Sequence, residues 1–340
     1  MLPRSHVCQG RPGNWFKILA AFVGAVLVFA PCVPLRAVIF YSTADPNYNT
    51  SAPTGTLLDS GWQWVGTWGG FQGAPIGPHH FLTARHVGGA VGDVFTLNGA
   101  GYTTVAVFDD AASDLRIWQV GETFPEWAPL YRASDEVGRP LIAFGRGLTR
   151  GAEVRDVASN TLRGWQWGPG DGRLRWGQNA VSSVVDGGSY WGALLYAKFD
   201  AAGGINEAHL ATGDSSGPVF INDGAGWKLA GIAAAVDGPF NTTNSGSGFN
   251  AAIFDLRGLY YNGAGGWTKV SGPTAVPTGF YVTRISPRTA WIDGIVPPQA
   301  EELSNDAPLL TPIEFIGFAA SLFGVGIFFI RRVPRLENSF

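Results

Sequence analysis

The sequence predicts an all-β protein whose core is built from many short strands. It contains 48 Gly, 22 Pro and 13 Trp, and only 14% of its 340 residues are charged. This composition is typical of turn-rich β proteins and not of helical bundles. Short apolar or aromatic runs alternate with clusters of Gly, Pro, Asn and Asp through the body of the chain. Such regular punctuation favours a β-barrel or a β-sandwich.

The first 37 residues have the pattern of a secretory signal peptide. Basic residues precede an apolar run over 18–30, and the small residue Ala37 follows two prolines. We predict cleavage after Ala37, because cleavage after Ala30 would leave Pro31 directly beyond the cut bond. An uncleaved membrane anchor is the alternative. The signal peptide therefore predicts export of the protein.

Cysteine content and charge exclude several classes of protein. Cys8 and Cys32 are the cysteines of the sequence and lie in the predicted leader, so the mature protein would have no disulfide. The net charge of -3, without a stripe of Lys or Arg, excludes a nucleic-acid partner. The neighbours His79 and His80 have no cysteine nearby, so we predict no metal site. No cofactor is expected.

Candidate strands follow the leader at short intervals. Residues 163–189, which are rich in Gly and Trp, are predicted to form a long surface excursion that shapes access to a site. The candidate strands are 62–68, 81–84, 94–97, 103–108, 115–120, 140–144, 193–199, 219–221, 228–236 and 280–285.

Three segments supply the residue types of a catalytic triad. His86 ends the sequence Thr-Ala-Arg-His, and Ser215 lies in Gly-Asp-Ser-Ser-Gly-Pro. A serine hydroxyl needs an imidazole to take its proton and a buried carboxylate to hold that imidazole. Asp109 and Asp110 are possible carboxylates, but Asp114 directly precedes an alternating strand and is the predicted member.

The order of these residues along the chain selects among serine hydrolases. Residues 213–217 also fit the G-x-S-x-G elbow of α/β-hydrolases, whose histidine follows the serine. No histidine follows Ser215 in this sequence. The order His, Asp, Ser also differs from the Asp, His, Ser order of subtilisin.

In these segments the sequence resembles the chymotrypsin/trypsin-like serine peptidases, in which T-A-x-H, D-[IL]-x-[IL] and G-D-S-G-G-P segments carry the triad. The resemblance covers the chain from about residue 62 to residue 295. It implies a chymotrypsin-like fold of two six-stranded antiparallel β-barrels and a short C-terminal helix. The first barrel would hold His86 and Asp114, and the second Ser215. Further matches are the strands at 229–232 and 279–285 and the helix at 290–292.

The resemblance also implies the roles of the site residues. His86 would be the general base, Asp114 would hold its tautomer, and Ser215 would be the nucleophile. The backbone N–H groups of Gly213 and Ser215 would form the oxyanion hole, and the glycine suits a loop with unusual backbone angles. The active site would lie in the cleft between the barrels.

The substrate pocket is where the sequence departs from trypsin. His209 stands six residues before the nucleophile, where an Asp would select Arg or Lys, so we expect no trypsin-like preference. Gly279 would leave the pocket open. Ala234 and Ala235 replace the usual Ser and Trp on the substrate-binding strand.

Other positions also differ from the family pattern. Ser216 stands where the family usually has Gly, and Arg85 where it usually has Ala or Gly. In the family, the residue at Asp214 often pairs with an amino terminus released on activation, yet no Arg-Ile-Val-Gly-Gly site is present. Either signal cleavage yields that terminus, or the site forms without one.

The C-terminal end predicts a membrane tether after a peptidase domain at 38–297. Residues 298–312 form an acidic, proline-bearing linker, 313–330 an apolar transmembrane helix, and 331–340 a basic cytoplasmic tail. This end resembles bacterial sorting tails of the Pro-Glu-Pro type, although its short motif differs.

Together these features predict an exported serine endopeptidase that acts on protein or peptide substrates. Its expected location is the cell envelope, most simply of a bacterium, with the body outside the membrane. The alternatives are a non-catalytic binding or adhesion module with the same fold, and an esterase that uses the same triad.

Overall fold

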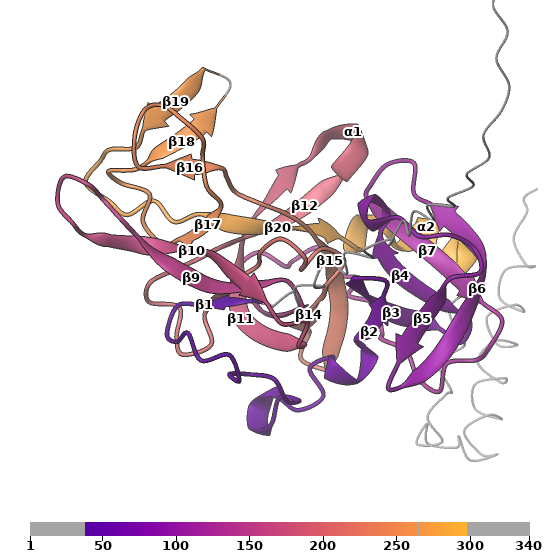
Figure 1. Ribbon diagram of the computed structural model, residues 1–340. Helices are drawn as coiled ribbons and strands as arrows, with labels where there is room; N and C mark the ends of the chain where they lie inside the picture. The colour runs from indigo at the N-terminus through magenta and orange to yellow at the C-terminus, as the bar shows by residue number, and fades with distance from the viewer. Residues whose placement is uncertain (1–37, 264, 298–340) are drawn as a thin grey trace, which may run out of the picture.

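The computed structural model describes residues 38–263 and 265–297, and its main elements are β-strands. Two closed barrels, each of six antiparallel strands, lie side by side (Figure 1). No helix within this part of the chain is long and apolar enough to cross a membrane. The predicted leader at 1–37, linker at 298–312, transmembrane helix at 313–330 and tail at 331–340 lie outside the described residues.

The first barrel has the strand order β2-β3-β4-β7-β6-β5. Its interior is aromatic: the Phe81 and Phe95 rings stack with centroids 4.1 Å apart, and Trp118 packs beside them. Large aromatic rings therefore fill much of this barrel. Its strands are β2 (Gly66–Trp68), β3 (Phe71–Gly77), β4 (His80–Ala84), β5 (Val94–Leu97), β6 (Ala100–Asp109) and β7 (Leu115–Val120).

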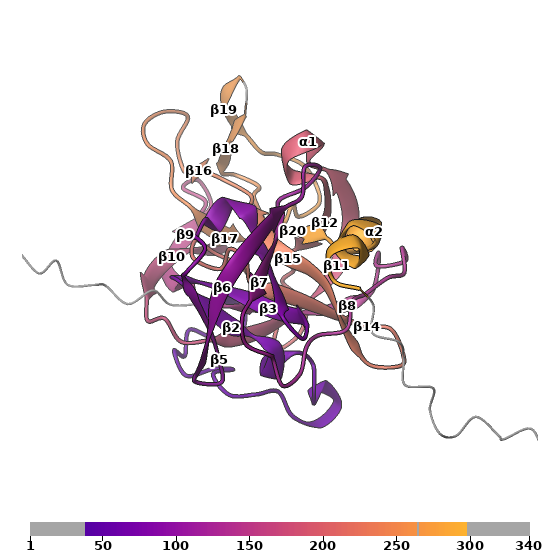
Figure 2. The same cartoon turned by 90° about the vertical axis from the view of Figure 1, so that its right-hand side faces the viewer.

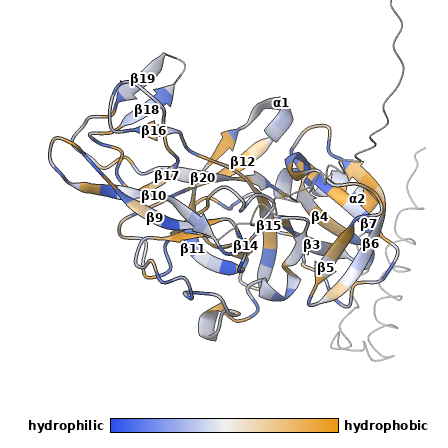
Figure 3. Cartoon of the chain, viewed as in Figure 1, coloured by the Kyte–Doolittle hydropathy of each residue, from blue (hydrophilic) through white to orange (hydrophobic). Residues whose placement is uncertain are grey.

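The second barrel has the order β11-β12-β20-β15-β14-β8 and an interior of mainly aliphatic side chains, such as Leu141, Leu195 and Val219. Apolar and polar residues are interspersed along the strands of both barrels (Figure 3), as expected where one face of each strand points inward. Its strands are β8 (Pro140–Gly145), β11 (Arg175–Asp186), β12 (Ala193–Lys198), β14 (Pro218–Asn222), β15 (Trp227–Val236) and β20 (Gly279–Arg284).

An apolar cluster joins the two barrels. Leu82 and Ile117 of the first barrel share it with Phe220 and Ile232 of the second. Helix α2 (Thr289–Ile295) lies beside the first barrel (Figure 2) and packs against the same cluster. This arrangement is the chymotrypsin-like fold that the resemblance implies, and the prediction of two barrels with a short C-terminal helix is confirmed.

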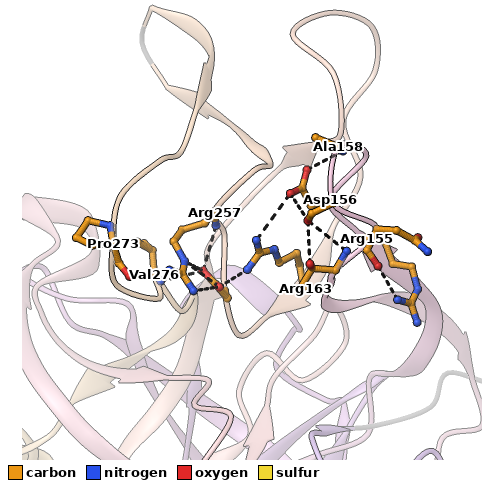
Figure 4. Close-up of polar contacts among 11 residues, drawn as sticks. Arg155, Asp156, Ala158, Arg163, Arg257, Pro273 and Val276 are labelled. Atoms are coloured by element: carbon orange, nitrogen blue, oxygen red, sulfur yellow. Dashed lines mark hydrogen bonds and ion pairs between the residues drawn. The ribbon is translucent and has the colours of Figure 1, made fainter.

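Two small sheets extend from the second barrel, at the left of Figure 1. Arg163 is central to their polar contacts, because its guanidinium pairs with Asp255 and reaches Asp156 at 3.8 Å (Figure 4). Arg257 also binds Asp255 and donates to the Pro273 carbonyl oxygen. The sheets are β9 (Leu148–Arg155), β10 (Leu162–Gly170) with β17 (Ala251–Ile253), and β16 (Phe240–Asn241), β18 (Tyr260–Gly263) with β19 (Gly266–Lys269).

The structure corrects one predicted strand and the predicted surface excursion. Trp62–Trp64 is a 3-10 turn, η2, and the strand begins only at Gly66. The predicted surface excursion at 163–189 contains strands β10 and β11, and β11 is part of the second barrel. Small and polar residues interrupt the alternation of apolar and polar residues along β11. The remaining short elements are η1 (Gly55–Leu57), η3 (Arg85–Val87), η4 (Ser286–Arg288), α1 (Gly188–Trp191), β1 (Ile39–Phe40) and β13 (Ala208–His209).

Candidate active site

His86 and Asp114 meet because two neighbouring strands of the first barrel end side by side. Strand β4 leads into the 3-10 turn that carries His86, and Asp114 directly precedes β7. Nδ1 of His86 lies 2.5 Å from Oδ2 of Asp114, and the backbone N–H of His86 donates to Oδ1 at 3.0 Å. Asp114 is fully buried, whereas the His86 side chain is 23% exposed. The carboxylate thus fixes the ring and leaves its outer edge open.

The loop before Asp114 is held by a second buried carboxylate. Arg288, at the start of the C-terminal helix, donates to both oxygens of Asp110, each at 2.5 Å. The Ser113 hydroxyl donates to Asp110 at 2.6 Å. Burial alone would raise the pKa of Asp110, but these hydrogen bonds hold it below its usual value. Asp110 therefore anchors the loop, and its oxygens do not face His86.

Ser215 lies in the loop that leads into β14 of the second barrel, and its side chain is partly exposed. Gly213 has a φ of +93°, and a Cβ there would meet Gly147 Cα at 2.8 Å. A Cβ at Gly217 would meet the Phe144 carbonyl oxygen at 2.1 Å. Both glycines are therefore required by the path of this loop, as the sequence predicted for Gly213.

The amides expected for the oxyanion hole take no part in the hydrogen bonds within this loop. The Asp214 amide donates to Ala211 and the Gly217 amide donates to Asp214. The amides of Gly213 and Ser215, in contrast, donate no hydrogen bond to any of the described residues. These two donors are available to an oxyanion.

The serine loop contacts the histidine strand through the residue after the nucleophile. Within residues 38–263 and 265–297, no hydrogen bond joins the Ser215 hydroxyl to His86. Such bonds are often long in enzymes without substrate and shorten in the complex. Across the barrel boundary, the Ala84 amide donates to Oγ of Ser216 at 2.9 Å. Ala84 is two residues before His86, so the loop that carries Ser215 is tied to the end of the strand that leads to His86.

Asp214 is buried beside the first residues that the structure describes. Its carboxylate accepts hydrogen bonds from the amides of Gly147 and Ala211, each at 2.7 Å, and from the amide of Val38. Burial raises the pKa of Asp214 to about 7, although these amides and the charge of Arg175 oppose the rise. The amide of Val38 is thus directed at an acidic group that has no ion pair among the described residues.

A cavity of about 160 Å³ adjoins Ser215. Ala234, one of the predicted pocket residues, lines it together with Ala235 and Val236. Within the described residues, the lining includes neither His209 nor Gly279, the other predicted pocket residues. Apart from Asp214, whose carboxylate is held by backbone amides, the lining side chains carry no charge. The remaining lining residues are Leu210, Ala211, Thr212 and Ala233.

His209 is buried at a distance from solvent and cannot act as a charged selector. Its Nδ1 donates to the Leu210 carbonyl oxygen at 2.5 Å, and its ring packs edge-on against Phe199 and Phe280. Burial lowers the pKa of His209, so the ring stays neutral. His209 is therefore a structural residue of the second barrel and offers no charge to a substrate.

Two aromatic residues lie near His86 in the structure, and the sequence did not predict them. Trp191 of α1 packs edge-on against the His86 ring, with centroids 5.6 Å apart. The Arg85 guanidinium lies over the neighbouring Tyr190 ring at 4.6 Å and donates to the Asp110 carbonyl oxygen. Tyr190 and Trp191 lie just beyond the predicted surface excursion at 163–189, and no motif marks a ring that packs on a distant histidine. Among the described residues no cluster of His, Cys, Asp or Glu could hold a metal ion.

Comparison with known proteins adds a likeness of fold. No protein-family model matches the chain, and no curated protein matches it. Among solved structures it is similar to neuropsin, a serine protease expressed in the limbic system of mouse brain. The identity is 15% and the TM-score is 0.41, and the match covers 68% of this chain and 94% of that one.

Proposed function

We propose that the protein is a serine endopeptidase that cleaves peptide bonds with Ser215, His86 and Asp114. The observation that carries the proposal is the 2.5 Å contact between His86 and the buried Asp114, with a serine loop tied to the same strand. An exposed ring edge opposite a buried carboxylate is the geometry that a general base needs.

The proposed reaction follows from the atoms in place. His86 Nε2 accepts the proton of the Ser215 hydroxyl while Oγ bonds to the substrate carbonyl carbon. The amides of Gly213 and Ser215 stabilise the oxyanion. His86 then gives the proton to the leaving amine as the C–N bond breaks, and an acyl-enzyme forms on Ser215. Water, deprotonated by His86, releases the acid and regenerates the serine.

The pocket beside Ser215 supports a preference for an uncharged, apolar residue before the cut bond. Alanine and valine side chains line much of it, and they offer no partner to a Lys or Arg side chain. The proposed specificity is therefore unlike that of trypsin.

Maturation of the proposed enzyme depends on its amino terminus. Cleavage after Ala37, as the sequence predicts, would make Val38 the first residue and convert its amide to an α-ammonium beside Asp214. This placement supports the alternative in which signal cleavage itself yields the activating terminus, a role that the family resemblance implies. Export and a C-terminal membrane tether remain part of the proposal.

A non-catalytic binding module with the same fold is the second candidate. It is favoured by Ala234 and Ala235, which replace the polar and aromatic residues of the family's substrate strand, and by the added sheets of Figure 4. An esterase that uses the same triad is the third candidate.

Digestion of a peptide mixture by the mature chain, residues 38–297, tests the proposal. We expect cleavage after apolar residues that is lost in Ser215→Ala. Ester turnover without peptide cleavage would instead support the esterase. A folded mature protein that hydrolyses neither substrate would favour the binding module.

A further inference from the structure

Ser216 has a backbone conformation that a serine rarely adopts. Its φ is +66°, and its side chain is fully buried. A non-glycine residue held in this region costs on the order of 1 kcal/mol or more unless its surroundings fix it. A glycine would reach the same φ without strain. The serine must therefore gain something from its hydroxyl that offsets the strained backbone.

The gain is a directional bond between the barrels. Oγ of Ser216 accepts the Ala84 amide at 2.9 Å, and both residues are fully buried. The Ser216 amide donates to Ala233 of β15 at 2.8 Å, so the residue is fixed on its own barrel as well. Among the residues that the structure describes, the bond from Ala84 to Ser216 is the hydrogen bond that joins the 213–217 loop to the first barrel.

The apolar cluster between the barrels cannot supply the same control. Its contacts are not directional, so they tolerate small sliding movements of one barrel against the other. A buried hydrogen bond has a narrow range of length and angle. Ser216 is next to the nucleophile, and Ala84 is two residues before the base. Their bond therefore sets the separation of the two reacting side chains.

We infer that Ser216 is a positioning residue that holds Ser215 at the correct distance from His86. This inference rests on the proposed function, because it concerns the same nucleophile and base. Ser216 would take no part in proton transfer, and it would not bind the substrate. Its loss should therefore slow the acylation step and leave KM nearly unchanged.

Two substitutions separate the hydroxyl from the backbone. Ser216→Ala removes the hydroxyl and keeps the strained φ, whereas Ser216→Gly removes both. We expect each variant to lose roughly ten- to a hundredfold in kcat and in the rate of labelling by a fluorophosphonate, because a misplacement of about 1 Å costs up to about a hundredfold. The glycine variant should unfold at a higher temperature than the alanine variant. Activity and stability would then change independently.

Thr104→Val is the matched control. Thr104 is also buried, and its hydroxyl bonds to the backbone of Ala90, Gly92 and Asp93 within the first barrel and not to the second. This variant should keep the wild-type rate of labelling. A wild-type protein that is not labelled overturns both the proposed function and the role of Ser216. A wild-type protein that is labelled, with both Ser216 variants labelled at the wild-type rate, overturns the role of Ser216 alone. Equal slowing in Thr104→Val also overturns it.

Discussion

Individual side chains of the proposed site are held by buried partners and not by surface charges. Asp114 fixes the ring of His86 through Nδ1 and its backbone through the amide, so two bonds to one residue define the orientation. Asp110, which directly follows β6, anchors the same loop through Arg288. Removal of one such group leaves its partner buried without compensation, which makes these positions informative targets.

Asp114→Asn tests the proposed role of the carboxylate. Asparagine can still accept the His86 amide, but its NH₂ group cannot accept the ring proton, so the imidazole adopts the wrong tautomer. We expect kcat to fall by about 10⁴ with little change in KM. Steady-state kinetics on the peptide found by digestion measure both constants. Asp109→Asn is the control, because Asp109 pairs with Arg116 at the surface, and it should retain near wild-type activity. A loss of less than tenfold in Asp114→Asn would contradict the assignment.

Glu207 predicts a pH dependence of stability. It is buried, and its Oε1 accepts from the Asp200 amide and the Asn179 side chain. Burial raises the pKa of Glu207 to about 8. A carboxyl whose pKa is higher in the folded state stabilises fully below its unfolded value, near 4.5, and this contribution is lost as the pH rises to about 8.

Glu207→Gln removes this titration. Between pH 5 and 8 the wild-type free energy of unfolding should fall relative to that of the variant by more than about 1 kcal/mol, since one pKa unit corresponds to about 1.4 kcal/mol. Urea unfolding across this range measures the difference. Glu126→Gln, at an exposed position, should not change the slope. An unchanged slope in Glu207→Gln would show that Glu207 is ionised at little cost.

Local sequence patterns predict where strands and turns lie more directly than they predict which strands and side chains come into contact. The alternating run at β7 and the apolar run at β14 predict strands that the structure contains. Strand β11 was missed because Gly177 and small polar residues interrupt its apolar face, although it closes the second barrel. Trp191 lies between β11 and β12 of the second barrel, and it contacts His86 of the first barrel. No local sequence pattern encodes this contact between distant segments.

The candidate site shows the same limit. Motifs placed His86 beside Asp114 because the residues around them are typical of strand ends, and the pairing of β4 with β7 brings these ends together. The tie from Ser216 to Ala84 could not be predicted, because it depends on how two separate barrels are docked. The burial of His209 likewise depends on the ring of Phe199, which directly follows β12, and on the ring of Phe280 in β20.

The C-terminal helix predicts a test of how elements are joined. Arg288 pairs with the buried Asp110, whereas Arg132 pairs with Asp293 of the same helix where both side chains are more exposed. Arg288→Leu leaves Asp110 without its cation and should destabilise the protein by about 3 kcal/mol. Arg132→Leu should cost less than about 1 kcal/mol. Chemical unfolding of both variants compares them, and equal losses would contradict a special role for Arg288.

The whole molecule links the amino terminus to the proposed active site through Asp214. Val38 is buried in the second barrel's core, and β1 pairs with β13 shortly before the nucleophile loop. An α-ammonium at this point would provide a cation for a carboxylate that otherwise has amide partners. The proposed cleavage after Ala37 would therefore place the new terminus where it completes the surroundings of Asp214.

Extension of the mature chain by one alanine before Val38 should weaken the enzyme. The added residue moves the α-ammonium away from Asp214. The Asp214 carboxylate is buried, so the displaced ammonium cannot pack beside it. We expect kcat/KM to fall by at least about tenfold, because each 1.36 kcal/mol withheld from the active arrangement is a factor of ten. Activity of purified chains that begin at Val38 or one residue earlier measures the effect. Equal activities would support the alternative in which the site forms without a free terminus.

Labelling of the mature protein by a fluorophosphonate, followed by mass spectrometry of its peptides, is the most direct test of the proposed triad. The account predicts one covalent adduct on Ser215, absent from Ser215→Ala and strongly reduced in His86→Ala. A folded mature protein that carries no adduct, or one whose adduct maps to another serine, would contradict it.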